Sequence, residues 1–107
     1  MDRTINIFGT DYRVVDDESI IAQGFDGRVS VFEPTIRIRP YKDMLEEDDT
    51  DNEKKACYRE VLRHECIHAV FRETGNEEFM NDERLVQVLA ALFPKINRLF
   101  GELGIQS

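Results

Sequence analysis

The segment His64-Glu65-Cys66-Ile67-His68 constrains this chain more than any other stretch. In a helix, its two histidines lie one turn apart and about 40° from each other around the axis. Both imidazoles then reach one metal ion from the same face. Glu65 lies on the flank of that face, where a carboxylate can contact a metal-bound water. The pattern therefore requires a helix around it and a third ligand from another part of the chain.

The residues around this segment predict a helix over residues 51–75. Thr50 and Glu53 have the spacing of a capping box at its start, and Gly75 followed by Asn76 is typical of a left-handed helix end. An apolar stripe lies opposite the histidines, so the helix is expected to be central rather than peripheral. The stripe consists of Leu62, Cys66, Ala69 and Val70.

A second helical region is predicted over residues 81–104, with Asn81 or Asp82 as its cap and Gly104 at its end. Pro94 is expected to end or kink it, which gives one or two C-terminal helices. Glu83 opens the region after fourteen residues that follow His68. Two histidines, one glutamate and a water form a catalytic zinc set. Glu83 is therefore the preferred third ligand.

Other readings of these residues stay open. Glu77, Glu78 and Asp82 lie in the intervening loop or cap and compete for the third ligand position. The two histidines are also explained by ordinary hydrogen bonding in a partly buried helix. Glu65 between them and the acidic helix that follows favour metal binding over that explanation.

The first forty residues predict a small, mostly antiparallel sheet. Two strands are expected around Gly9, a third at Ile20–Ala22 and a fourth at Arg28–Phe32. Thr35–Arg39 alternates, with isoleucines inward and arginines outward, between Pro34 and Pro40. A strand with flanking prolines and exposed charges is expected at the edge of a sheet. Its arginines suggest an acidic or extended peptide as substrate.

Composition limits the class of partner. The 107 residues carry a net charge of −8, which disfavours nucleic acid and anionic membranes. The length fits one domain. Seven carboxylates between Asp43 and Glu53 predict a solvated acidic loop over residues 41–50; a calcium loop is the weaker alternative, because EF-hand glycine and spacing are absent. Cys57 and Cys66 are expected to be free, and without a signal peptide or membrane span the chain is expected in the cytoplasm.

The order of sheet, His64-Glu65-Cys66-Ile67-His68 helix, loop and Glu83 helix resembles the small gluzincin-type metallopeptidases. It is most similar to the minimal ones encoded in phages and bacteria, which are similar to the ImmA/IrrE peptidases. The resemblance covers Tyr12 to Pro94. It implies a zincin-like α+β fold, Zn²⁺ held by His64, His68 and Glu83, and an edge strand that binds a peptide as an added strand. Thr35–Arg39 would be that strand.

The resemblance also implies a zinc-dependent endopeptidase in which Glu65 acts as general base. Tyr12, Tyr41 and Tyr58 are the tyrosines considered as oxyanion donors, with no basis for choosing among them. Two alternatives belong to other functional classes. One is an inactive zincin-fold module that binds metal or protein, and the other is a metal-free interaction protein of a phage or mobile element.

Overall fold

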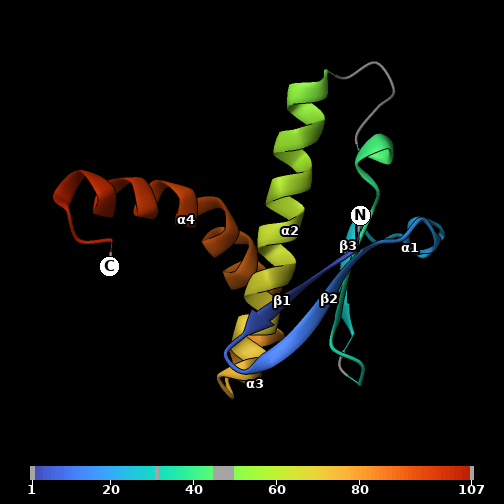
Figure 1. Cartoon of the computed structure of the whole chain (residues 1–107), viewed down its shortest axis with the longest axis horizontal. Helices are drawn as coiled ribbons and strands as arrows, with labels where there is room; N and C mark the ends of the chain where they lie inside the picture. The colour runs from blue at the N-terminus through green and yellow to red at the C-terminus, as the bar shows by residue number, and fades with distance from the viewer. Residues whose placement is uncertain (1, 31, 45–49, 107) are drawn as a thin grey trace.

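The computed structural model describes residues 2–30, 32–44 and 50–106. Figure 1 shows an α+β fold in which the described residues form a small four-stranded mixed sheet and four α-helices. In chain order the elements are β1 (Arg3–Ile7), β2 (Thr10–Asp16), α1 (Ser19–Ala22), β3 (Gly27–Ser30), β4 (Thr35–Ile38), the 3₁₀ helix η1 (Tyr41–Asp43), α2 (Asp51–Glu73), α3 (Glu77–Met80) and α4 (Glu83–Leu103).

The sheet has the strand order β1-β2-β4-β3. The pairs β1–β2 and β3–β4 are antiparallel, and β2–β4 is parallel. The sheet is therefore mixed, where the sequence predicted a mostly antiparallel one. The predicted pair of strands around Gly9 is confirmed. Phe8 and Gly9 form its turn with φ angles of 47° and 99°, and glycine adopts such a positive angle without steric cost.

The prediction that Thr35–Arg39 is an edge strand is wrong. β4 lies between β2 and β3, so the sheet edges are β1 and β3. The outward arginines misled the sequence reading because each is paired with an aspartate next to the sheet. Arg37 Nη1 lies 2.9 Å from Asp17 Oδ2, and Arg39 Nη1 lies 3.3 Å from Asp26 Oδ1. The two prolines lie outside the four residues of the strand, so they remove no hydrogen bond from it.

The structure also differs from the sequence predictions in several local elements. Ile20–Ala22 lies in the short helix α1 instead of a strand, and the loop expected before Asn81 contains the short helix α3. α4 continues through Pro94, so this proline does not end the helix. The predicted strand Arg28–Phe32 is represented by β3, which ends at Ser30. Residues 45–49, half of the predicted acidic loop and part of its calcium alternative, lie outside the described residues.

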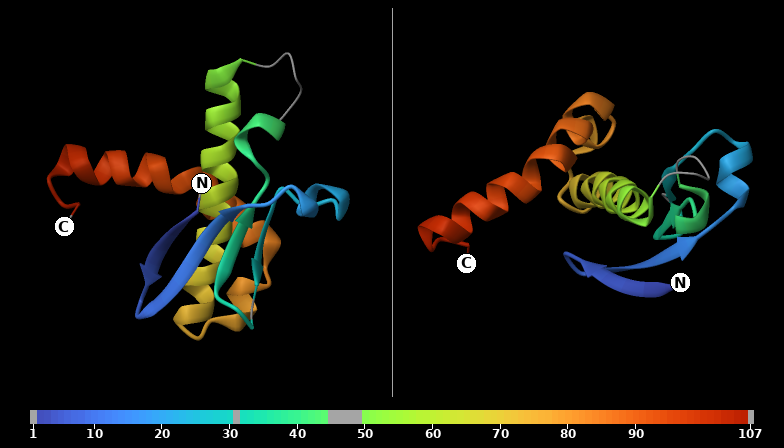
Figure 2. Two further views of the ribbon diagram at one scale, coloured as in Figure 1. Left: turned by 45° about the vertical axis from the view of Figure 1, so that its right-hand side comes forward. Right: turned by 90° about the horizontal axis from the view of Figure 1, so that it is seen from above.

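The predicted helix over residues 51–75 is confirmed as α2. Thr50 Oγ1 accepts a hydrogen bond of 3.2 Å from the backbone N–H of Glu53, and Gly75 follows the helix with a φ of 76°. Figure 2 shows α2 between the sheet and α4. One core joins α2 to the sheet; its buried residues are Ile7, Tyr12, Val14, Ile36, Ile38, Met44 and Ala69.

Polar contacts tie the C-terminal end of α2 to β2. The hydroxyls of Thr10 and Tyr12 donate to the two carboxylate oxygens of Glu73. These hydrogen bonds lower the pKa of Glu73 below its ordinary value, and the one from Thr10 has the largest effect. Glu73 therefore has a structural role: it holds the end of α2 against β2, away from the histidine face of α2.

A second, smaller core joins α2 to α4. Ile67 of α2 packs against Val86 and Ala90 of α4, and all three are at most 6% exposed. The C-terminal part of α4 extends away from the rest of the molecule in Figure 1, and Leu99 and Leu103 are exposed there. In the described part of the chain, no helix has the length and apolar character needed to cross a membrane.

Candidate metal centre

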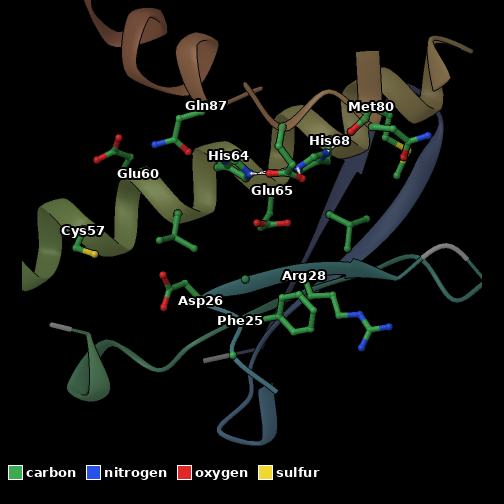
Figure 3. Close-up of a pocket in the computed structure, with 16 residues that line it drawn as sticks. Phe25, Asp26, Arg28, Cys57, Glu60, His64, Glu65, His68, Met80 and Gln87 are labelled. Carbon is green, nitrogen blue, oxygen red and sulfur yellow. Dashed lines mark hydrogen bonds and ion pairs between the residues drawn. The ribbon is translucent and has the colours of Figure 1, made fainter. Parts of the chain in front are cut away.

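Helix α2 places both motif histidines on the side that faces α3 and α4. The Nε2 atoms of His64 and His68 lie 3.1 Å apart, as the helical spacing predicts. The side chains are 16% and 9% exposed, so both rings are largely enclosed. In Figure 3 the two rings lie side by side above the cleft. The pair therefore presents two nitrogen atoms to one point.

Glu83 brings a carboxylate to the same point from the other helix. Its Oε2 lies 3.0 Å from His64 Nε2, and its Oε1 lies 2.8 Å from His68 Nε2. Glu83 is the first residue of α4, directly after Asp82, whose side chain accepts a hydrogen bond from the backbone N–H of Leu85. A capped helix start and the α2–α4 core together place the backbone of Glu83 beside the histidines, and its side chain, which is 72% exposed, reaches them from there.

A backbone carbonyl orients the second histidine. His68 Nδ1 lies 2.6 Å from the carbonyl oxygen of Met80, at the end of α3. A proton on Nδ1 donated to this oxygen leaves the lone pair of Nε2 directed at the cluster. Outer-shell contacts of this kind set the tautomer and ring orientation of metal-binding histidines. The short helix α3, which sequence reasoning missed, supplies this contact.

The donor set fits a zinc ion. One ligand atom each from His64, His68 and Glu83 forms a group in which all atoms lie within 4.8 Å of one another. Ligands about 2.0–2.1 Å from a tetrahedral zinc lie about 3.3 Å from each other. The contacts of 3.1, 3.0 and 2.8 Å among these residues are close to that separation. Two imidazoles and one carboxylate leave a fourth position for water or substrate.

Glu65 lies beside this cluster but points elsewhere. Figure 3 shows its side chain directed from α2 towards β3. Only 7% of the residue is exposed. Burial, and then the nearby charge of Glu83, raises the pKa of Glu65 to about 7. A carboxyl group with a pKa near neutrality can both accept and return a proton at physiological pH.

A cleft of about 680 Å³ is lined by the three candidate ligands and by Glu65. Its floor and walls come from α2, β3 and the start of α4. Asn81 and Gln87 also line it, and sequence reasoning placed neither of them at the site. Gln87 had a detectable signal, because it lies one helical turn after Glu83. Glu60, one turn before His64 on α2, is a further lining residue found by the same rule.

Several residues considered from the sequence lie elsewhere. None of the three tyrosines lines this cleft. Tyr12 is buried against Glu73, Tyr41 donates to Asp51, and Tyr58 donates to Asp16. Among the described residues, the group that could hold a metal contains neither Asp82 nor the two glutamates of α3. Cys57 and Cys66 are free, as expected, and pack partly buried against the core of α2 and the sheet.

No protein-family model matches the chain, and no curated protein or solved structure gives a significant match. The likeness to the gluzincin-type peptidases therefore depends on the motif residues of the sequence alone.

Proposed function

We propose that this protein is a zinc-dependent peptidase whose metal is held by His64, His68 and Glu83. The observation that supports it most is the contact of one carboxylate with both motif histidines, at 3.0 and 2.8 Å. The three residues come from two helices, and Glu65 lies beside them in the same cleft. Donors of the right kind, their spacing and an adjacent base together favour catalysis over a structural metal.

The edge strand β3 is the proposed docking site for the substrate, in place of Thr35–Arg39. The backbone N–H of Arg39 donates to Asp26 O at 2.8 Å, and Gly27 pairs with Ile38 in the register. Hydrogen-bonded and non-hydrogen-bonded pairs alternate along an antiparallel ladder. The N–H and C=O groups of Gly27 and Val29 therefore point away from β4, towards the free edge. An extended peptide added there would bind through these backbone groups.

The two arginines that suggested an acidic substrate do not line the cleft. Arg37 and Arg39 pair with Asp17 and Asp26 and are not among the residues that line the cleft. Recognition through the backbone of β3 requires an extended peptide but no particular side-chain charge. The proposed substrate class is therefore an extended peptide segment.

The chain's own residues divide the chemistry between them. When bound, zinc would polarise the peptide carbonyl and lower the pKa of water towards neutrality. Glu65 accepts a proton from the attacking water and returns it to the leaving amine. The edge of β3 aligns the peptide, and His68 keeps its orientation through the carbonyl of Met80.

Zinc content and hydrolysis test the proposal in sequence. Protein purified without a histidine tag is expected to hold about one zinc per chain by elemental analysis, and Glu83→Ala is expected to lose or weaken it. A peptide library is then offered to wild type and to Glu65→Gln, which should retain zinc and lose hydrolysis. Hydrolysis retained in Glu65→Gln refutes the mechanism. Zinc without hydrolysis in wild type would instead indicate a module that binds metal without turnover.

A further inference from the structure

The side chain of Glu65 approaches β3 closely at Gly27. A Cβ atom built on Gly27 would lie 2.7 Å from Cγ of Glu65, 3.0 Å from its Oε2 and 3.0 Å from Cγ1 of Val61. Real Cβ atoms essentially never show contacts shorter than 3.0 Å. The Cγ atom lies in the middle of the glutamate side chain. A methyl group at this position therefore displaces the whole carboxylate arm of Glu65.

Backbone conformation does not explain the glycine at this position. The glycines with positive φ are Gly9, Gly24, Gly75 and Gly104, and Gly27 is not one of them. It is the first residue of β3 and pairs regularly with Ile38. Alanine fits such a backbone and often stabilises a protein there by restricting the unfolded chain. Glycine is needed at position 27 because a side chain there would occupy the space of Glu65.

We propose that Gly27 is a positioning residue for Glu65: the space left by its missing side chain is where the carboxylate arm lies. The inference rests on the proposed function, because it gives Glu65 the role of base. Gly27 also has its N–H and C=O directed at the free edge of β3. One residue thus contacts the base on one side and the incoming peptide on another. The position of the base relative to the peptide is therefore set by a single backbone position.

Thermal unfolding of metal-free protein tests the contact without any reference to catalysis. The variants are Gly27→Ala, Glu65→Ala and the double variant. Gly27→Ala is expected to lower Tm when Glu65 is present, and to leave Tm unchanged or raise it when residue 65 is alanine, because the obstructing arm is gone. An equal loss of Tm in both backgrounds overturns the proposal.

Two controls separate Glu65 from other causes. Gly101→Ala makes the same substitution inside α4, where the nearest atoms belong to the flexible side chain of Gln106 at 3.2 Å. It is expected to raise Tm, since alanine favours the helix. A Val61→Ala background tests the other close neighbour of Gly27. Recovery of Tm in that background alone would assign the space to Val61 and overturn the proposal.

Metal content and turnover supply the functional readout. Gly27→Ala is expected to keep zinc at the wild-type level and to lose hydrolysis at least about 100-fold, within the range that general bases contribute. Loss of zinc in Gly27→Ala would show a broader distortion and would overturn the positioning role. A wild type that cleaves no peptide refutes the proposed function, whereas the unfolding experiment still decides whether Gly27 makes room for Glu65.

Discussion

The burial of Glu65 predicts that its own carboxylate destabilises the metal-free protein. The pKa of Glu65 is raised from 4.5 to about 7, by burial first and by Glu83 second. Between these two pH values the unfolded chain releases the proton while the folded chain retains it. Folding stability therefore falls as the pH rises from 4.5 to about 7, and it stays lower above that pH. Below pH 4.5 both states are protonated, and the cost is absent.

Replacement by glutamine gives the magnitude. Gln has a similar shape and no charge, so Glu65→Gln removes the titration and leaves most of the packing. A tenfold change in the acid dissociation constant corresponds to about 1.4 kcal/mol. The difference between 4.5 and about 7 then amounts to about 3 kcal/mol at pH 8. We expect Glu65→Gln to be more stable than wild type by up to this amount at pH 8.

Urea unfolding in the presence of a chelator measures this difference. Wild type and Glu65→Gln are compared at pH 4.5 and at pH 8, with circular dichroism as the signal. The two proteins should be nearly equally stable at pH 4.5 and should diverge at pH 8. Saturating zinc at pH 8 should narrow the gap, because a nearby cation favours the charged carboxylate. A free-energy difference that is the same at both pH values would refute the reasoning.

Three further predictions follow from the packing around the centre. Asp82→Ala removes the cap of α4 and is expected to cost about 1 kcal/mol, or about 4–8 °C in Tm, and to weaken zinc binding through Glu83; calorimetry with and without zinc measures both. Ala90→Leu overpacks the α2–α4 contact and is expected to cost about 1–3 kcal/mol in urea unfolding. Tyr12→Phe removes one of the two hydroxyls that lower the pKa of Glu73. That stabilisation is present above pH 4.5 and lost as the pH falls through the folded-state pKa, so the variant's stability should depend less on acid.

These variants have clear contradicting outcomes. Ala91→Leu adds the same side chain at an exposed neighbour of Ala90 and should leave urea unfolding nearly unchanged. Equal losses at both positions would show that the α2–α4 contact is not tightly packed. Identical acid unfolding curves for Tyr12→Phe and wild type would contradict the role assigned to the Tyr12–Glu73 contact.

Local sequence rules predicted the elements that carry the centre. The helical period places His64 and His68 on one face, and the Thr50 cap and Gly75 end give the limits of α2 within two residues. The position of Glu83 was within reach because capping residues mark the start of α4. The sequence preferred Glu83 as the third ligand but left Glu77, Glu78 and Asp82 open, since the choice depends on the angle between two helices packed through Ile67 and Ala90.

The order of the strands in the sheet could not be predicted from the sequence, for a different reason. Alternation in Thr35–Arg39 correctly identified a strand and its buried isoleucines, which are fully buried. The alternation could not reveal that the two arginines pair with aspartates from other segments. Arg37 pairs with Asp17, which precedes α1, and Arg39 pairs with Asp26, which precedes β3. Exposed-looking charges and flanking prolines describe a strand's own residues and not its neighbours. β3, one of the two edge strands, carries no edge signal of its own in so short a segment.

The three proposed metal ligands also have a consequence for the order of folding. His64 and Glu83 are only 19 positions apart, whereas the contacts of β2 with the end of α2 span about 60 positions. Short loops close at low entropic cost, and contacts between distant residues form late and slowly. We therefore expect zinc to bind a helical hairpin of α2 and α4 before the end of α2 docks on β2. Stopped-flow refolding should then be faster with zinc than with chelator, and equal rates would place metal capture after this docking.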